Sequence, residues 1–178
     1  FGQIINKATV SINGEIMNNT CIHSDIVINN DTIRVYNVHL ASNWLNINDY
    51  NFFKNGKKGN IRADINGIII KMKNSYKKRA EEAKAIKAHI ENSPYAVVVC
   101  GDFNDTPVSY AYNTIRRNLK DAFEESGIGI GRSFIKIPAL RIDYLLHDNN
   151  LKSFNYIQHN QKLSDHYPIS CELEIINP

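Results

Sequence analysis

The segment that most constrains the fold is the apolar run at residues 96–100, AVVVC, which breaks at once into the polar sequence GDFNDTP. A continuous apolar run of this length predicts a central strand that is covered on both faces. Just before it, residues 68–91 carry apolar side chains at steps of three and four, which predicts a long amphipathic helix ended by the NSP segment at 92–94. A helix leading directly into a buried strand is typical of an α/β domain.

Shorter segments surround this helix and strand. Residues 20–40 hold two alternating apolar runs, which predict a β-hairpin. Residues 41–66 have no sustained period and are interpreted as a long irregular connection, with a short helix inside it as the alternative. A second helix is expected after Pro107. Short strands are expected in RSFIKI (132–137), RIDYLLH (141–147), LKSFNYIQ (151–158) and YPISCELEI (167–175). This order predicts mixed sheets with outer helices in a single domain over residues 1–178.

The composition limits the functional classes. With 178 residues and 43% hydrophobic content, the chain is long enough for one sizeable core. Its net charge of +3 is too small to imply a nucleic-acid or membrane partner without a local patch. The three cysteines are far apart and have no metal-ligand spacing, so buried free thiols are expected rather than a zinc site or a disulfide framework. No apolar stretch approaches the roughly 20 residues that span a bilayer.

Polar residues follow the central strand where it leaves the core. Asp102, Asn104 and Asp105 lie within four residues of one another. Polar groups at such a position are costly unless they are hydrogen-bonded or bind a ligand. A turn is the alternative, because Asp, Asn and Pro favour loops. We therefore interpret Asp105 as a cap of the next helix, and we leave Asp102 and Asn104 open between a site and a turn.

Other polar residues interrupt strand signals further along the chain. Asp143 lies inside RIDYLLH, where an unpaired carboxylate is expensive and an imidazole would be a good donor. His39 ends an apolar strand and is either a satisfied core histidine or part of a site. Asp165 and His166 share a loop before the last strand, where Asp165 suits a cation and His166 is either solvated or able to contact a phosphate. Polar intrusions at four strand ends indicate that one site collects them.

The order of four motifs carries a resemblance to a known family. NVHLAS, VVVCGDFNDTP, RIDYLLH and LSDHYPI together resemble the endonuclease/exonuclease/phosphatase superfamily, the deoxyribonuclease-like metal-dependent phosphoesterases. The resemblance covers residues 20–176, about the C-terminal two-thirds of the family's domain, and is greatest to bacterial members. It implies a four-layer α/β sandwich with mixed, mostly antiparallel sheets and outer helices, in which the first sheet is incomplete.

The resemblance also implies roles for individual residues. By motif, Asp102 would orient or deprotonate the attacking water, and Asn104 would bind the phosphate and fix that geometry. His166 would contact the phosphoryl oxygens and stabilise their charge in the transition state. Asp143 would hold His166 in the useful tautomer, as an orienting carboxylate does in catalytic triads. His39 matches the upstream histidine that some branches of the superfamily place beside the phosphate.

A divalent cation follows from the same resemblance. Asp165 would contribute to the metal site, which in this superfamily holds Mg²⁺ or Mn²⁺. Oxygen ligands suit a hard cation, and the absence of cysteine ligands also favours such a cation over zinc. The implied substrate is a phosphoester in a nucleic acid, a phospholipid headgroup or a small phosphate ester.

One departure from the family pattern bears on activity. The resemblance implies an earlier half with an Asn near the first strand and a Glu in a QE motif that is a principal metal ligand, and neither motif is in this chain. We interpret the chain as a truncated piece that can be inactive alone; the alternative is a noncatalytic phosphate-binding or interaction module. A piece lacking strands is expected to expose apolar sheet edges and to self-associate. The resemblance also allows membrane attachment of a longer parent.

Two basic segments could meet an anionic partner. KNGKKGNIR (54–62) and KNSYKKR (73–79) concentrate positive charge. Such segments suit the phosphates of nucleic acids or anionic lipid headgroups. The alternative is a solvated loop and a solvated helix face.

Overall fold

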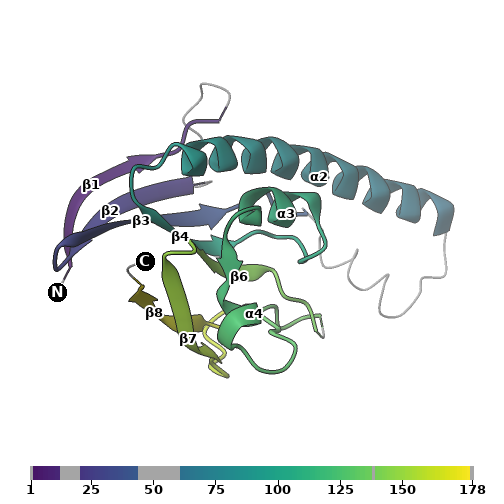
Figure 1. The fold of residues 1–178 in the computed structure, drawn as a ribbon. Helices are drawn as coiled ribbons and strands as arrows, with labels where there is room; N and C mark the ends of the chain where they lie inside the picture. The colour runs from purple at the N-terminus through teal and green to yellow at the C-terminus, as the bar shows by residue number, and fades with distance from the viewer. Residues whose placement is uncertain (1, 13–20, 44–60, 138, 177–178) are drawn as a thin grey trace.

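The computed structural model of the chain describes residues 2–12, 21–43, 61–137 and 139–176. Figure 1 shows the longest helix on one side of a large sheet and a smaller sheet on the other. The elements are β1 (Gln3–Thr9), β2 (Cys21–Ile28), β3 (Asp31–His39), α2 (Ile61–Glu91), β4 (Ala96–Asp102), α3 (Tyr110–Arg116), β5 (Lys120–Asp121), α4 (Ala122–Ser126), β6 (Asp143–His147), β7 (Leu151–Gln158) and β8 (Ile169–Ile175).

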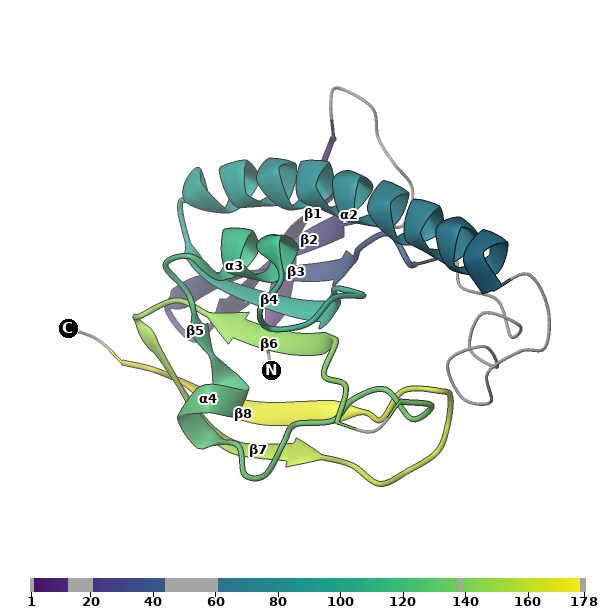
Figure 2. The ribbon, with the colours of Figure 1, turned by 90° about the vertical axis from the view of Figure 1, so that its right-hand side faces the viewer.

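The large sheet has the strand order β1-β2-β3-β4-β6-β5, and β7 and β8 form the second sheet. Strands β3 and β4 are parallel, whereas every other pair is antiparallel. The parallel pair requires a crossover, which α2 provides. Helices α2 and α3 cover one face of the large sheet, and the β7–β8 sheet lies on its other side (Figures 1 and 2). The predicted mixed, mostly antiparallel α/β architecture with outer helices is confirmed.

The main core lies between the large sheet and the helices. Its members are inward-facing side chains of β2, β3, β4 and β6 together with α2 and α3, including Tyr36, Val38, Ala83, Ile86, Val97, Val99, Tyr112, Ile115, Tyr144 and Leu146. Strand β4 has a neighbour on each side, so the apolar run at 96–100 is the central strand that was predicted. The predicted hairpin is also confirmed: β2 and β3 pair down to Ile28 and Asp31, and Asn29 turns the chain with a φ of 56°.

Helix α2 differs from its prediction in two ways. It begins at residue 61, so residues 61–66 are helical where an irregular connection was expected, and residues 44–60 lie outside the described part. Its buried face also includes Arg79 and Glu82, which are 0% and 2% exposed. Arg79 pairs with Asp105 at 3.0 Å, and Glu82 accepts a hydrogen bond from the Ala41 amide at 2.8 Å. Because Asp105 neutralises Arg79 and the Ala41 amide hydrogen-bonds Glu82, both charged side chains can occupy the buried face.

Two smaller expectations were wrong. RSFIKI is not a strand, since within it only Phe134 forms a single bridge, to His166. Asp105 does not cap the next helix: Ser109 is the cap of α3, and its Oγ accepts from the Tyr112 amide at 3.1 Å. All three cysteines are free, as expected, but only Cys21 is buried, whereas Cys100 and Cys171 are partly exposed. None of the helices in the described ranges is both long and apolar enough to cross a membrane.

Candidate active site

The ends of three neighbouring strands bring His39, Asp102 and Asp143 into one row. In the sheet register, His39 of β3 lies opposite Asp102 of β4, and Asp102 lies opposite Asp143 of β6. Because β3 and β4 are parallel and β6 is antiparallel to them, β3 and β4 end at the edge where β6 begins (Figure 2). Ligand sites in α/β folds are commonly built at such an edge.

The backbone around Asp102 depends on a glycine. Gly101 has a φ of 140°, and a Cβ at this position would lie 1.9 Å from the Val38 carbonyl oxygen. No other residue type could follow this path without moving β3 away. Phe103 is fully buried with its ring centroid 4.9 Å from that of Tyr144, so it anchors the chain directly after Asp102. The site carboxylate is thus held from both sides.

Asn104 fixes the orientation of the Asp102 carboxylate. It has a φ of 51°, a left-handed conformation that Asn tolerates well. Its backbone amide donates to Asp102 Oδ1 at 2.7 Å, and its Nδ2 donates to Asp102 Oδ2 at 3.1 Å and to the Leu40 carbonyl at 2.9 Å. Both carboxylate oxygens therefore accept a hydrogen bond from one residue, which also ties β4 to the end of β3.

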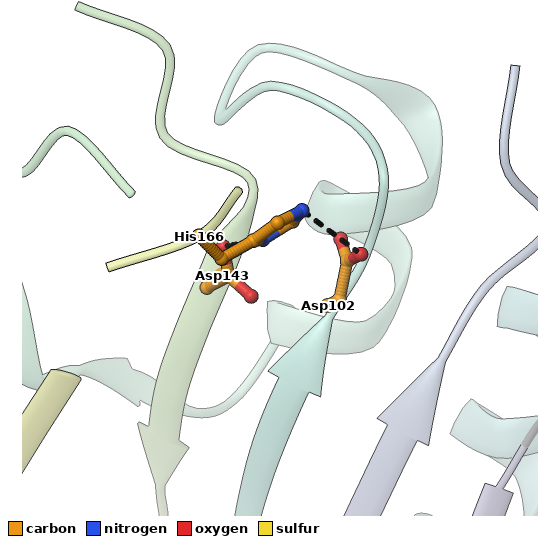
Figure 3. Close-up of side chains that lie close together, drawn as sticks. All are labelled: Asp102, Asp143 and His166. Atoms are coloured by element: carbon orange, nitrogen blue, oxygen red, sulfur yellow. Dashed lines mark hydrogen bonds and ion pairs between the residues drawn. The ribbon is translucent and has the colours of Figure 1, made fainter. Parts of the chain in front are cut away.

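His166 reaches the same edge from the loop before β8. Its Nδ1 lies 2.8 Å from Asp143 Oδ2, and the carboxylate makes Nδ1 a donor (Figure 3). The Phe134 ring packs edge-on against the imidazole, with the centroids 5.1 Å apart. Ser133 is fully buried and its Oγ accepts from the Asp143 amide at 3.0 Å, which holds the start of β6. The predicted pairing of Asp143 with an imidazole is present in the structure.

Two imidazoles converge on one oxygen of Asp102. His39 Nε2 and His166 Nε2 each lie 4.0 Å from Asp102 Oδ2. A distance of 4.0 Å is too long for a direct hydrogen bond, but it suits a single bridging oxygen. The His39 side chain is 62% exposed and that of His166 is 26% exposed, so the gap between them opens to solvent.

The electrostatics of the site raise the pKa of both Asp102 and His166. Burial raises the pKa of Asp102, and the neighbouring Asp143 carboxylate raises it further. The hydrogen bond with Asp143 raises the pKa of His166, and the negative charges of Asp143 and Asp102 act in the same direction. Asp102 therefore binds a proton more readily than an ordinary carboxylate, and His166 loses its proton less readily than an ordinary histidine. The two groups face each other across the gap.

Within the described part of the chain, Asp102, Asp143 and His166 form a group that could hold a metal ion. One ligand atom of each lies within 4.8 Å of the others. Two carboxylates that lie side by side repel each other, and the Asp143 charge adds to the effect of burial in raising the pKa of Asp102. A cation would offset this repulsion, and carboxylate oxygens are the ligands that hard cations prefer. The residues present therefore fit a divalent cation.

The structure places Asp165 outside this group. Its Oδ2 lies 2.8 Å from the Nζ of Lys136, and this contact lowers the pKa of Asp165. Its backbone carbonyl accepts from the Ile135 amide at 2.9 Å. Asp165 and His166 thus serve different partners, as expected of neighbours on an extended chain. The assignment of Asp165 to a metal stays a prediction.

Sequence reasoning missed the residues that support the site from behind. Arg79 donates to Asp105 and, at 2.8 Å, to the carbonyl of Ala41, so α2 holds the loops after both β3 and β4. The Tyr144 hydroxyl donates to the Asp105 carbonyl at 2.7 Å. A signal existed, because Arg79 and Glu82 are spaced one turn apart in phase with Ile86, but charged residues in a helix are ordinarily assigned to its exposed face.

The fold and the site define an α/β protein in which carboxylates and imidazoles meet at one edge of a mixed sheet. Residues 22–166 match the model of the "Endonuclease/Exonuclease/phosphatase family". This match covers well over half of the chain. The chain belongs to this family.

Solved structures with the same fold are distant in sequence. A functionally unknown conserved protein from Enterococcus faecalis V583 aligns with 98% of this chain and 67% of its own, at 14% identity and a TM-score of 0.69. The human Nocturnin catalytic domain with bound sulfate anion aligns over 98% and 60%, at 14% identity and 0.67. A mannosyl-6-phosphatase from Bacteroides thetaiotaomicron VPI-5482 aligns over 98% and 67%, at 13% identity and 0.63.

The chain therefore spans about two-thirds or less of the length of these structures. At such identities the likeness shows the fold and leaves function to the site. A comparison with curated proteins finds no match.

Proposed function

We propose that the protein to which this chain belongs hydrolyses phosphoesters with the help of a divalent cation and a water activated by Asp102. The observation that carries the proposal is the convergence of His39 Nε2 and His166 Nε2 on Asp102 Oδ2, each at 4.0 Å. A nucleophilic oxygen and a phosphoryl group need a base and positively charged donors close together, and this gap supplies both. Membership in the family agrees with this class of reaction.

Asp102 is the proposed base. Its carboxylate takes a proton from the water as the water oxygen attacks phosphorus and the bond to the leaving oxygen breaks. The raised pKa brings Asp102 closer to the pH at which a base works best. Asn104 holds this carboxylate and is our proposed phosphate ligand. Because both of its Nδ2 hydrogen bonds are already made to Asp102 and Leu40, positioning is its better-supported role.

His166 is the proposed donor to the phosphoryl oxygens. Since Nδ1 donates to Asp143, the imidazole donates through Nε2 only when it carries both protons, and Asp143 favours that state. Asp143 acts through His166 and is a positioning residue. His39 approaches the same oxygen of Asp102 from β3 and is the second imidazole beside the phosphate.

A divalent cation, Mg²⁺ or Mn²⁺, would supply charge neutralisation for the phosphoryl oxygens when it is bound. Asp102 is one carboxylate that could bind the cation, and Asp165 is a second proposed ligand, taken from the family motif. The geometry offers a second assignment, in which Asp102, Asp143 and His166 hold the ion together. The two assignments differ in whether Asp165 must leave Lys136.

The substrate class stays open among nucleic acids, phospholipid headgroups and small phosphate esters. Two neighbours in fold point to phosphate chemistry: one is a mannosyl-6-phosphatase, and the other was solved with a bound sulfate anion, which resembles phosphate in shape and charge. Neither is similar enough in sequence to identify a substrate here.

The proposal is tested in the longest natural protein that contains this sequence. With Mg²⁺ and the generic diester bis(p-nitrophenyl) phosphate, hydrolysis should be lost on chelation and restored by the metal. Asp102→Ala or His166→Ala should lower kcat/KM by at least about a hundredfold. The control is His159→Ala, which removes an imidazole that hydrogen-bonds Ser170 in the second sheet. Unchanged activity in both site variants would refute the proposal, and phosphate binding without turnover would favour the noncatalytic module.

Self-association through sheet edges is a further part of the proposal. Strand β1 is an edge strand, and Ile4 and Ile5 on it are 60% and 51% exposed. Unpaired strand edges with apolar side chains favour pairing with another chain. Sedimentation velocity between about 5 and 100 μM should show a concentration-dependent dimer, and Ile4→Lys should shift it toward the monomer. A monomer at every concentration would count against this surface.

A further inference from the structure

Helix α2 extends past the edge of the sheet that bears the candidate site. At Arg79 the helix is already level with this edge, because Arg79 contacts Ala41 and Asp105, which follow the ends of β3 and β4. Residues 61–78 come before that point and add about 27 Å at the rise of an α-helix. Figures 1 and 2 both show α2 reaching beyond the ends of the strands. We call residues 65–78 of this overhang the arm.

The arm exposes large apolar side chains. Ile65, Ile69 and Tyr76 fall on one face of the helix and are 38%, 55% and 44% exposed, and Ile70 is 59% exposed. Tyr76 is held in place by the Arg79 guanidinium, which lies 4.7 Å from the ring centroid. Single exposed apolar residues are ordinary, but four on less than four turns of one helix mark an interaction surface.

The arm is also locally basic. It contains Lys71, Lys73, Lys77 and Lys78 and no acidic residue, although the whole chain has a net charge of only +3. Lys73 and Lys77 are exposed, lie one turn apart and fall between Ile69 and Ile70 around the helix. The same surface therefore presents apolar and cationic side chains together.

This combination selects one kind of partner. A nucleic acid would satisfy the lysines but leave the isoleucines in water. A second copy of the arm would cover the isoleucines but bring like charges together. An anionic bilayer satisfies both, since isoleucine and tyrosine enter the interface while lysine side chains reach the headgroup phosphates.

We propose that the arm is an interfacial helix that binds anionic lipid bilayers from the side of the molecule that bears the candidate site. Binding needs the surface of α2 alone and does not depend on turnover at Asp102. It therefore stands or falls separately from the proposed hydrolysis.

The experiment is co-sedimentation of the chain with vesicles of phosphatidylcholine containing 30 mol% phosphatidylserine, in about 0.1 M salt. Wild type should bind these vesicles, bind pure phosphatidylcholine more weakly, and lose affinity as the salt rises. Lys73→Glu/Lys77→Glu should weaken binding at least about tenfold, because each lysine near an anionic surface contributes about fivefold. Ile69→Gln/Ile70→Gln should weaken binding about tenfold and leave its salt dependence in place.

Matched controls make the same changes elsewhere. Lys7→Glu/Lys152→Glu changes the net charge equally at exposed positions of β1 and β7, and Ile128→Gln/Ile130→Gln removes two isoleucines that are 96% and 67% exposed. Both should bind like wild type. Helical circular dichroism and the urea midpoint establish that every variant is folded.

Three results would overturn the proposal. The first is no binding of wild type at about 1 mM accessible lipid, and the second is an equal loss of affinity in the arm and control variants. The third is that single-stranded DNA displaces the chain from vesicles, that this displacement requires Lys73 and Lys77, and that Ile69→Gln/Ile70→Gln has no effect. The last result would assign the arm to nucleic acid.

Discussion

Two clusters in this molecule combine histidines with carboxylates, and they do so with opposite results. The site cluster lies at the sheet edge and consists of His39, Asp102, Asp143 and His166. The buried cluster lies between the sheet and α2 and consists of His23, Asp25, Arg34, Tyr36 and His89. In the site cluster the two imidazoles lie 4.0 Å from Asp102, and the gap is open to solvent. In the buried cluster the ion pair of Asp25 with Arg34 is 2.6 Å and nearly dry.

The two clusters move histidine pKa values in opposite directions. The bond with Asp143 raises the pKa of His166. Burial lowers the pKa of His23 and of His89, and the positive charge of Arg34 lowers both further. Burial is the largest cause at His23 and His89, and the charge of Arg34 adds to it. At His166 the hydrogen bond with Asp143 is the largest cause, because this carboxylate faces an imidazole and not a guanidinium.

Removing the carboxylate of the buried cluster should have the largest effect on stability. Asp25→Ala leaves Arg34 without its bidentate partner at 2.6 and 2.8 Å and removes the acceptor of Asn6. The loss of one partner of a buried pair costs about 3 kcal/mol of the free energy of unfolding. Urea denaturation at pH 7.5 checks this value. Glu124→Ala, which breaks the exposed pair with Arg116, should cost less than about 1 kcal/mol, and equal losses would show that the burial of Asp25 is unimportant.

Removing the carboxylate that faces His166 should instead change catalysis. In the proposed mechanism His166 acts while it carries both protons, so the rate should fall as the pH rises through the raised pKa of His166. Asp143→Asn removes the first cause of that raised pKa, so the alkaline limb should move to lower pH and kcat at pH 7.5 should fall at least about tenfold. The pH profile of kcat/KM measures the limb. Asp31→Asn, at the first residue of β3, should keep the wild-type profile. An unmoved limb in Asp143→Asn would show that Asp143 does not control the protonation of His166.

The buried histidines should make the protein sensitive to acid. Because their folded pKa values are lowered, the unfolded chain binds more protons below the ordinary histidine pKa of about 6.5, and their contribution to stability falls as the pH falls through that value. His23 is 5% exposed and its Nδ1 has no hydrogen-bond partner within the described structure. His23→Phe should therefore lose less stability than wild type between pH 7.5 and 5.5, as measured by urea denaturation.

The raised pKa values of Asp102 and His166 act in the opposite direction, since the folded chain holds those protons more tightly. The difference between wild type and His23→Phe isolates the buried histidine from these groups. His159→Gln, a change at a partly exposed histidine of the β7–β8 side, is the control and should keep the wild-type dependence on pH. A constant difference between wild type and His23→Phe would show that burial leaves His23 free to accept a proton.

The site was accessible from the sequence because its residues lie at strand ends. Val97 to Val99 predicts a buried strand, and a buried strand that breaks into Asp102 must place that carboxylate at an edge. The row of His39, Asp102 and Asp143 then follows from strand register, which apolar patterning largely determines. The buried cluster could not be predicted in the same way. His23 and Asp25 alternate with their neighbours like any half-buried strand, and only the pairing of β2 with β3 brings Arg34 to Asp25.

The start and the inner face of α2 show another limit. Apolar periodicity predicts a helix from residue 68 and puts Ile69 and Tyr76 inside, whereas the structure buries Arg79 and leaves both apolar residues exposed. Periodicity ranks side chains by transfer to an apolar phase, so it cannot anticipate a guanidinium whose charge is met by Asp105 at 3.0 Å. Periodicity also cannot show whether an apolar face of the helix packs against the sheet or is exposed to solvent where the helix extends beyond the end of the sheet.

The smallest expected effect is a change in Mg²⁺ affinity, which tests whether Asp165 is a ligand of the cation. Lys136 neutralises Asp165 at 2.8 Å, so a cation at Asp165 must compete with an ammonium group. Lys136→Ala should raise the affinity for Mg²⁺ about threefold in isothermal titration, because an exposed pair of this kind contributes less than about 1 kcal/mol. Lys152→Ala removes the same charge from β7 and should leave the affinity unchanged.

If Asp102, Asp143 and His166 hold the ion without Asp165, neither Lys136→Ala nor Asp165→Asn will change the affinity, whereas Asp143→Asn will lower it. A cation at that group would also compete with the imidazolium of His166 for Asp143, so this assignment and the proposed role of His166 as a donor exclude each other.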